Sequence, residues 1–295
     1  MRRLFLCVLF IVPALLVLTT TPGCSKKDAD KKVVKKGGDE NKKGGNGDEE
    51  TKTSLNAKLD STITGKVTFD GDPPPLVPEP QMKPDHKDFK VCKAGNEKET
   101  SKQTWFVDPK TKAVANVVVW LEPPAGKYFN LADEDKKRTD VIEMDQPHCA
   151  FVPHVVAVFP KYFDGKELVK TGQTFRIKNS APVQHNSKWP AYGVTNKSFN
   201  ETISAGDKRE PSLTPQDEPI NIQCNFHNWM NGWIWVFDNP YHAVTKEDGT
   251  FTIKNVPTDV EVTVVGWHDA KQKFFTKKMT FKKGENKLDD LKISK

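Results

Sequence analysis

The sequence Cys224-Asn225-Phe226-His227-Asn228-Trp229-Met230 decides how the rest of the chain is interpreted. It places a thiol, an imidazole and a thioether at C-x-x-H-x-x-M spacing on one short loop. A strand-like run over residues 220–224 leads into this loop and the apolar residues 233–237 lead out of it, which predicts two strands. Soft sulfur combined with imidazole is a ligand set that favours copper. The sequence therefore predicts a copper-binding loop between two strands.

A mononuclear blue-copper site holds its metal with two histidines, one cysteine and a weak axial methionine. Cys224, His227 and Met230 supply three of these ligands, so a second histidine must come from elsewhere in the chain. His185 is the candidate, because it follows a predicted strand over residues 174–178 and a loop that begins at Asn179.

These residues resemble the ligand loops of the cupredoxins, the type 1 copper proteins, and the C-x-x-H-x-x-M spacing is that of amicyanin. In cupredoxins the first ligand histidine is often followed by an asparagine whose side chain ties its loop to the cysteine loop, and Asn186 fits that role. The resemblance covers residues 141–238. It implies a Greek-key β-sandwich with one type 1 copper ion.

The amino terminus resembles a bacterial export signal over residues 1–24, with Arg2 and Arg3 before the apolar run 4–18. The end of this signal resembles a lipobox, which implies lipidation of Cys24 and a membrane anchor. Thr21 and Pro22 depart from the usual lipobox pattern, so ordinary cleavage nearby, giving a soluble exported protein, is the alternative. In either case we expect the protein on the periplasmic side of a bacterial membrane or at the cell surface.

Residues 25–58 contain Lys, Asp, Glu, Gly and Asn with almost nothing to bury, which predicts a disordered tether. The formal charge of the chain is +6, and this tether and the leader hold most of the excess. A basic footprint for nucleic acid is therefore not supported.

A second β-sandwich is predicted around the cupredoxin-like region. Residues 239–295 contain a T-x-x-D-G-x-F-x-I-x-N-V-P run that resembles the carboxypeptidase-regulatory-like, transthyretin-type sandwich, whose relatives include accessory domains of rhamnogalacturonan lyases. The strands with which that family usually begins lie upstream, within residues 59–140. We expect these two segments to form one sandwich, with residues 141–238 inserted between them. Three consecutive β-segments without such pairing are the alternative. The predicted fold class is thus all-β, and the whole array resembles methylamine-utilization-type cupredoxin proteins of bacteria.

Cys92 and Cys149 are the cysteines of the expected mature chain that remain once Cys24 is assigned to lipid and Cys224 to copper, because Cys7 lies within the export signal. An exported protein in an oxidising compartment would pair them in a disulfide, and two buried free thiols are the alternative. His148 and His154 flank Cys149 closely enough to invite a second metal site, but a hydrogen-bonding role is the commoner one.

The sequence favours an electron-transfer protein of the cell envelope, with redox proteins as partners, and not an enzyme. A copper-dependent oxidoreductase would need further histidine ligands, and the sequence contains no His-x-His motif. The competing hypothesis is a surface-anchored module whose sandwich binds carbohydrate or protein, with a structural or vestigial metal site.

Overall fold

The computed structural model describes residues 52–295. The expected export signal, Cys24 and most of the expected tether lie outside these residues. The structure differs from the expected tether at its end, because residues 53–55 form strand β1 (Thr53–Leu55), which pairs in parallel with β4 (Lys127–Phe129). Leu55 explains the difference, since its side chain packs against the core of the second sandwich described below.

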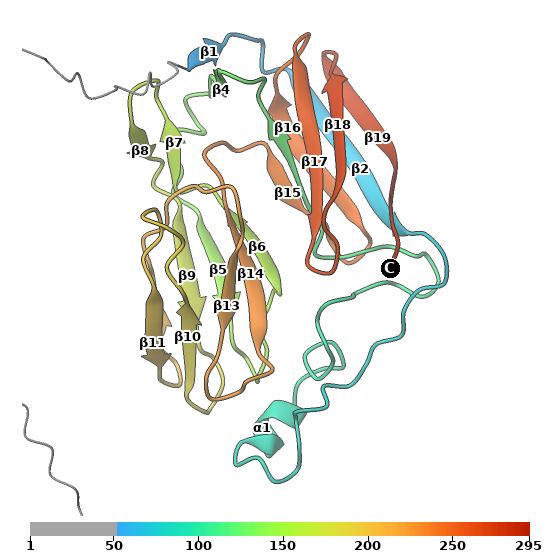
Figure 1. The fold of residues 1–295 in the computed structure, drawn as a ribbon, viewed down its shortest axis with the longest axis vertical. Helices are drawn as coiled ribbons and strands as arrows, with labels where there is room; N and C mark the ends of the chain where they lie inside the picture. The colour runs from blue at the N-terminus through green and yellow to red at the C-terminus, as the bar shows by residue number, and fades with distance from the viewer. Residues whose placement is uncertain (1–51) are drawn as a thin grey trace, which may run out of the picture. The chain divides into compact units, whose positions relative to one another are not determined.

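The described chain is almost entirely β-structure, which confirms the predicted fold class. The helix of residues 52–295 is α1 (Phe89–Lys93), which is 5 residues long. The larger sheets form two β-sandwiches (Figure 1).

The first sandwich carries the predicted metal ligands. Its five-stranded sheet has the order β11-β10-β13-β14-β6, and its three-stranded sheet has the order β12-β9-β5. Buried side chains of both sheets form one core, which includes Ile177 and Ile234. A separate hairpin, β7-β8, follows β6. The strands are β5 (Val141–Asp145), β6 (Val155–Val158), β7 (Lys161–Phe163), β8 (Leu168–Lys170), β9 (Thr174–Lys178), β10 (His185–Trp189), β11 (Phe199–Ile203), β12 (Lys208–Arg209), β13 (Ile220–Gln223) and β14 (Asn231–Val236).

The second sandwich combines strands from both sides of the first in the sequence. Its sheets have the orders β15-β3-β17-β18 and β16-β2-β19, so β2 lies between two strands that follow it by more than a hundred residues. Strand β3 likewise lies between β15 and β17. The strands are β2 (Ser61–Phe69), β3 (Val118–Glu122), β15 (His242–Val244), β16 (Thr250–Val256), β17 (Glu261–His268), β18 (Gln272–Thr280) and β19 (Gly284–Ile293).

Burial along the strands follows their sequence patterns. In β2, Ile63, Gly65 and Val67 face the core, and the residues between them face outward, as the alternation of apolar and polar residues requires. Strand β3 is apolar at successive positions, because both of its faces are covered. One face packs in the core of its own sandwich, and Trp120 on the other face packs against Trp235 of the first sandwich, with ring centroids 4.7 Å apart.

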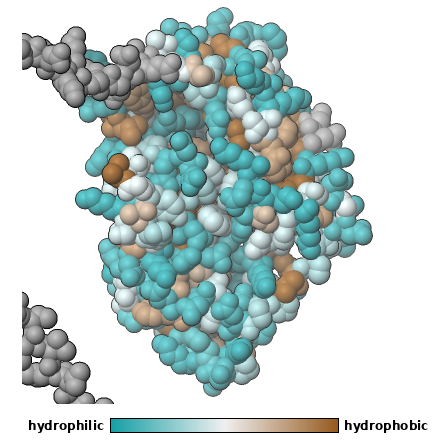
Figure 2. Space-filling view, viewed as in Figure 1, coloured by the Kyte–Doolittle hydropathy of each residue, from teal (hydrophilic) through white to brown (hydrophobic). Residues whose placement is uncertain are grey.

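The surface offers little contiguous apolar area on the face that Figure 2 shows, where hydrophilic residues surround small separate hydrophobic patches. Large apolar residues that are exposed are spread over the chain: Val77, Val141, Leu168, Val194 and Phe226. Within residues 52–295, no helix combines the length and the hydrophobicity that a membrane span requires.

Candidate metal centre

The predicted ligand loop joins two paired antiparallel strands. Cys224 directly follows β13 and Met230 directly precedes β14, and the register pairs Gln223 with Asn231 across the base of the loop. Inside the loop, the Met230 N–H donates to the His227 carbonyl over 2.9 Å, and the Cys224 N–H donates to the Met230 carbonyl over 3.3 Å. These hydrogen bonds fix the loop backbone from which the side chains project.

His185 reaches the same place as the first residue of β10. This strand pairs with β13 through Lys188 and Gln223, which sets the start of β10 beside the ligand loop. Asn186 then links the two segments. Its side-chain oxygen accepts from the Asn225 N–H over 2.5 Å, and its amide group donates to Asn200. Asn186 therefore joins the start of β10 to the loop that begins at Cys224.

Three donor atoms converge in the interior. The Cys224 Sγ lies 3.9 Å from the Nδ1 atoms of both His185 and His227, and these two nitrogens are 3.1 Å apart. Metal bonds to imidazole nitrogen and thiolate sulfur are about 2.0 and 2.3 Å long, so one ion spans nitrogen pairs up to about 4.0 Å apart and nitrogen–sulfur pairs up to about 4.3 Å apart. All three separations fall within those limits. Met230 is also buried, in the same apolar cluster as Cys224.

The protonation states suit a metal cation. Burial lowers the pKa of His185 and of His227 to about 4, although Asp88 acts in the opposite direction on His227. Both imidazoles are therefore neutral at neutral pH, as metal ligation requires. Burial raises the pKa of the Cys224 thiol, so metal binding there must displace a proton from sulfur. The donor set fits a soft or borderline cation such as copper.

The two remaining cysteines of the described chain form a disulfide beside the site. Cys92 and Cys149 are bonded, with Cα atoms 4.8 Å apart, and Cys224 is a free, buried thiol. The Cys149 sulfur also lies within 4.8 Å of ring nitrogens of His185 and His227. A disulfide sulfur is not a thiolate, so Cys224 is the sulfur that suits ligation.

Asp88 and His86 contact the site from a distant part of the chain. Asp88 Oδ2 lies 3.2 Å from His227 Nε2, and the His86 ring lies 5.0 Å from the His227 ring. The sequence offered no signal for either residue. They precede His227 by about 140 positions in a polar loop without a recognisable motif.

The other histidines that invited a metal interpretation have protein partners. His148 contacts the Glu99 carboxylate, and His154 contacts both the Asn231 carbonyl and the Asp269 carboxylate. These contacts give the hydrogen-bonding role that the sequence favoured.

Similarity to known proteins is limited to structures. No family model matches the chain, and no curated protein matches it. Amicyanin from Paracoccus versutus (Thiobacillus versutus) is 13% identical over 35% of this chain and 87% of that chain, with a TM-score of 0.27. A copper-containing nitrite reductase from Thermus scotoductus is 14% identical over 34% of this chain and 23% of that chain, also with a TM-score of 0.27. Likeness at this level settles neither the fold nor the function of this chain, so the assignment of the site depends on its geometry.

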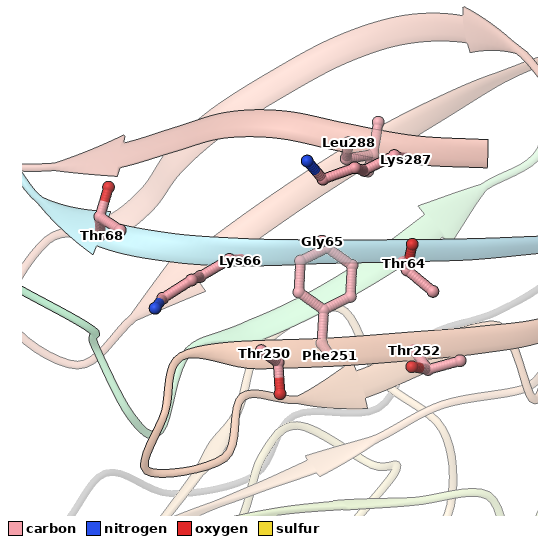
Figure 3. A pocket seen from close by; sticks show the side chains of 9 residues that line it. All are labelled: Thr64, Gly65, Lys66, Thr68, Thr250, Phe251, Thr252, Lys287 and Leu288. Carbon is pink, nitrogen blue, oxygen red and sulfur yellow. The ribbon is translucent and has the colours of Figure 1, made fainter. Parts of the chain in front are cut away.

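The second sandwich has a groove on the face where a carbohydrate could bind. It has a volume of about 530 Å³ and lies over β16, β2 and β19, where the lining side chains are mainly threonine and lysine (Figure 3). Phe251 is its one aromatic residue, and the ring packs across Gly65 with only 3% of its surface exposed. A buried ring offers no face on which a sugar can stack, so the groove does not favour the carbohydrate hypothesis.

Proposed function

We propose that the chain binds one copper ion through His185, Cys224, His227 and Met230, and that it transfers electrons without catalysing a reaction. The observation that carries this proposal is the convergence of two neutral imidazole nitrogens and one free thiol inside an apolar core. Copper would supply a single-electron couple at this place.

The protein's own contribution is rigidity and the exclusion of water. Strands β10, β13 and β14 hold the donors, and the three converging residues are at most 2% exposed. A site whose ligands are already in place needs little rearrangement when the metal changes oxidation state. This property suits a carrier of single electrons, and redox proteins are the proposed partners.

The visible spectrum after addition of Cu(II) tests the proposal. We expect one copper per chain and an intense absorption from charge transfer between the thiolate and Cu(II). Cys224→Ser should abolish this absorption, because a hydroxyl is a poor ligand for a soft metal. The far-ultraviolet circular dichroism of the variant should remain that of a β-protein. Absorption that survives Cys224→Ser, or copper binding without this absorption, would contradict the type 1 assignment.

We further propose that the protein works in the cell envelope, anchored by lipid on Cys24. The sequence of residues 1–24 supports this location, and the Cys92–Cys149 disulfide is typical of an oxidising compartment. Mass spectrometry of the mature amino terminus should find a lipid-modified Cys24. An unmodified amino terminus at another residue would exclude the anchor and leave export intact.

A further inference from the structure

Residues 78–101, here called the cap loop, cover the metal centre. They leave the chain between β2 and β3, and a bridge between Pro78 and Ser101 closes the base of the loop. Its far part is fixed to the first sandwich by the Cys92–Cys149 disulfide. The disulfide thus attaches the cap loop covalently to the first sandwich, on the side that carries the proposed metal ligands.

Asp88 is the acidic cap-loop residue that contacts a proposed metal ligand. Its side chain is 12% exposed, and its Oδ2 lies 3.2 Å from the Nε2 of His227, whose side chain is fully buried. A ring nitrogen that faces a carboxylate carries the proton, so His227 donates from Nε2 and keeps the lone pair on Nδ1. That Nδ1 is the atom that faces Cys224 and His185.

The surroundings leave Asp88 as the anionic group in contact with the His227 ring. Lys87 Nζ lies 3.3 Å from the same carboxylate, but the Lys87 side chain is 74% exposed, so water screens its charge. Both ring nitrogens of His86 have hydrogen-bond partners other than His227. Its Nδ1 accepts from the Asp88 N–H over 3.2 Å, and its Nε2 lies 3.3 Å from the Phe226 carbonyl.

We propose that Asp88 is a positioning residue of the metal centre, which fixes the tautomer and ring orientation of His227 and favours the oxidised state of the metal. This inference rests on the proposed function. A carboxylate that accepts the far N–H of a ligand histidine makes that imidazole a stronger donor. A nearby negative charge also stabilises Cu(II) more than Cu(I), because Cu(II) carries the larger charge.

Two substitutions separate the charge of Asp88 from its hydrogen bond. Asp88→Asn keeps the size of the side chain and an acceptor oxygen but removes the charge. Asp88→Ala removes both. Asp85→Asn is the matched control, because Asp85 is an exposed carboxylate of the same loop. Peptide mapping under non-reducing conditions should find the Cys92–Cys149 disulfide in every variant.

Three measurements report on the proposal. The midpoint potential of the copper protein should rise in Asp88→Asn relative to the wild type and to Asp85→Asn. The affinity for Cu(II) should fall about 10- to 100-fold in Asp88→Ala, the usual effect of losing a partner of a metal ligand. In ¹⁵N NMR spectra of the Cu(I) protein, the His227 Nε2 proton should exchange slowly in the wild type and rapidly in Asp88→Ala.

The outcomes distinguish this inference from the proposed function. A wild-type protein with the thiolate absorption, but with the same potential, Cu(II) affinity and proton exchange in all the variants, would overturn the role of Asp88 alone. A wild-type protein without the thiolate absorption would overturn the proposed function and the role of Asp88 together. A shift of equal size in Asp85→Asn would assign the effect to general charge rather than to the contact with His227.

Discussion

Met230 is the proposed ligand whose removal should leave the copper in place. In a type 1 copper site the axial thioether is a weak ligand, while two imidazoles and a thiolate hold the ion. Met230→Leu should therefore retain copper and its colour but raise the midpoint potential, because the lost donor favours Cu(II). Voltammetry measures the shift. Met279→Leu is the control, since Met279 packs against the core of the second sandwich and should leave the potential unchanged. An unchanged potential in Met230→Leu would remove Met230 from the ligand set.

His268 gives the stability of the second sandwich a pH dependence. It is buried and stacks on Trp105 at 4.3 Å, and burial lowers its pKa from 6.5 to about 4. Between these values the unfolded chain binds a proton that the folded chain does not, so stability must fall as the pH falls. The free energy of unfolding decreases by about 1.4 kcal/mol for each pH unit between pH 6.5 and 4. Above pH 6.5, His268 is neutral in both states and has no such effect.

The test compares the wild type with His268→Gln in copper-free protein. Burial also lowers the pKa values of His185, His227 and His242, which add slopes of the same sign, so the difference between the two proteins isolates His268. Urea unfolding at several pH values should give a shallower decline for His268→Gln. Parallel declines from pH 6.5 to 4 would contradict the assigned pKa.

At the residue scale, local spacing predicts candidate ligands but does not predict which residues lie over them. Cys224, His227 and Met230 share one loop, so their spacing alone indicates a common target. Asp88 reaches His227 across 139 positions, through a loop whose path depends on a disulfide and on the packing of two sandwiches. No periodicity in the sequence around Asp88 reports such a contact.

At the scale of single elements, the approach of β16 to β2 depends on Gly65. A Cβ atom built at Gly65 would lie 2.5 Å from the tip of the Phe251 ring, closer than real side-chain contacts allow. Gly65→Ala should lower the free energy of unfolding by about 1–3 kcal/mol, the usual cost of overpacking a core. Chemical denaturation measures the loss. Thr64→Ala, on the outward face of the same strand, should change stability little. In Phe251→Leu, whose side chain is shorter, the cost of Gly65→Ala should shrink.

Strand prediction succeeded where burial alternates and failed where a strand depends on a distant partner. Residues 63–69 alternate apolar and polar side chains, which predicts a strand, and they lie in β2. The charged residues within 122–140 predict a loop, yet residues 127–129 form β4 because β1 pairs beside them. The apolar run 114–121 predicts a strand, but β3 begins only at Val118, since the positive φ of 63° at Asn116 interrupts extended backbone.

At the scale of the whole molecule, tryptophans join the two sandwiches. The Trp235 ring lies 4.7 Å from Trp120 and 5.6 Å from Trp267, and all three are at most 4% exposed. Trp120→Ala should destabilise the protein by about 3–5 kcal/mol, the usual cost of emptying such a site. Trp120→Phe keeps an aromatic ring there and should cost less. Thermal unfolding followed by circular dichroism compares them, and equal losses would show that the ring contact contributes nothing.

The order of the sequence motifs predicts that the second sandwich is formed by segments on both sides of residues 141–238. It does not predict which of their strands pair. A family resemblance suggested that strands on either side of residues 141–238 belong together. The register of β2 with β16 and β19 depends on side-chain packing across the whole unit, as in the contact between Gly65 and Phe251. Neither strand pattern alone specifies it, because an alternating strand fits many partners.

The position of β2 between β16 and β19 also determines when its sheet can form during synthesis of the chain. During synthesis, residues 61–69 leave the ribosome long before residues 250–256 and 284–293, with which they pair. Contacts between residues so far apart in sequence form slowly, and the unpaired edges of a strand are prone to aggregate until these contacts form. The strands of the first sandwich are contiguous in sequence, so all of them have been synthesised before the second sandwich can close. During synthesis, β2 is therefore exposed to aggregation from the time it leaves the ribosome. This exposure ends only when β19, the last strand, with 10 residues, has been made and pairs with it.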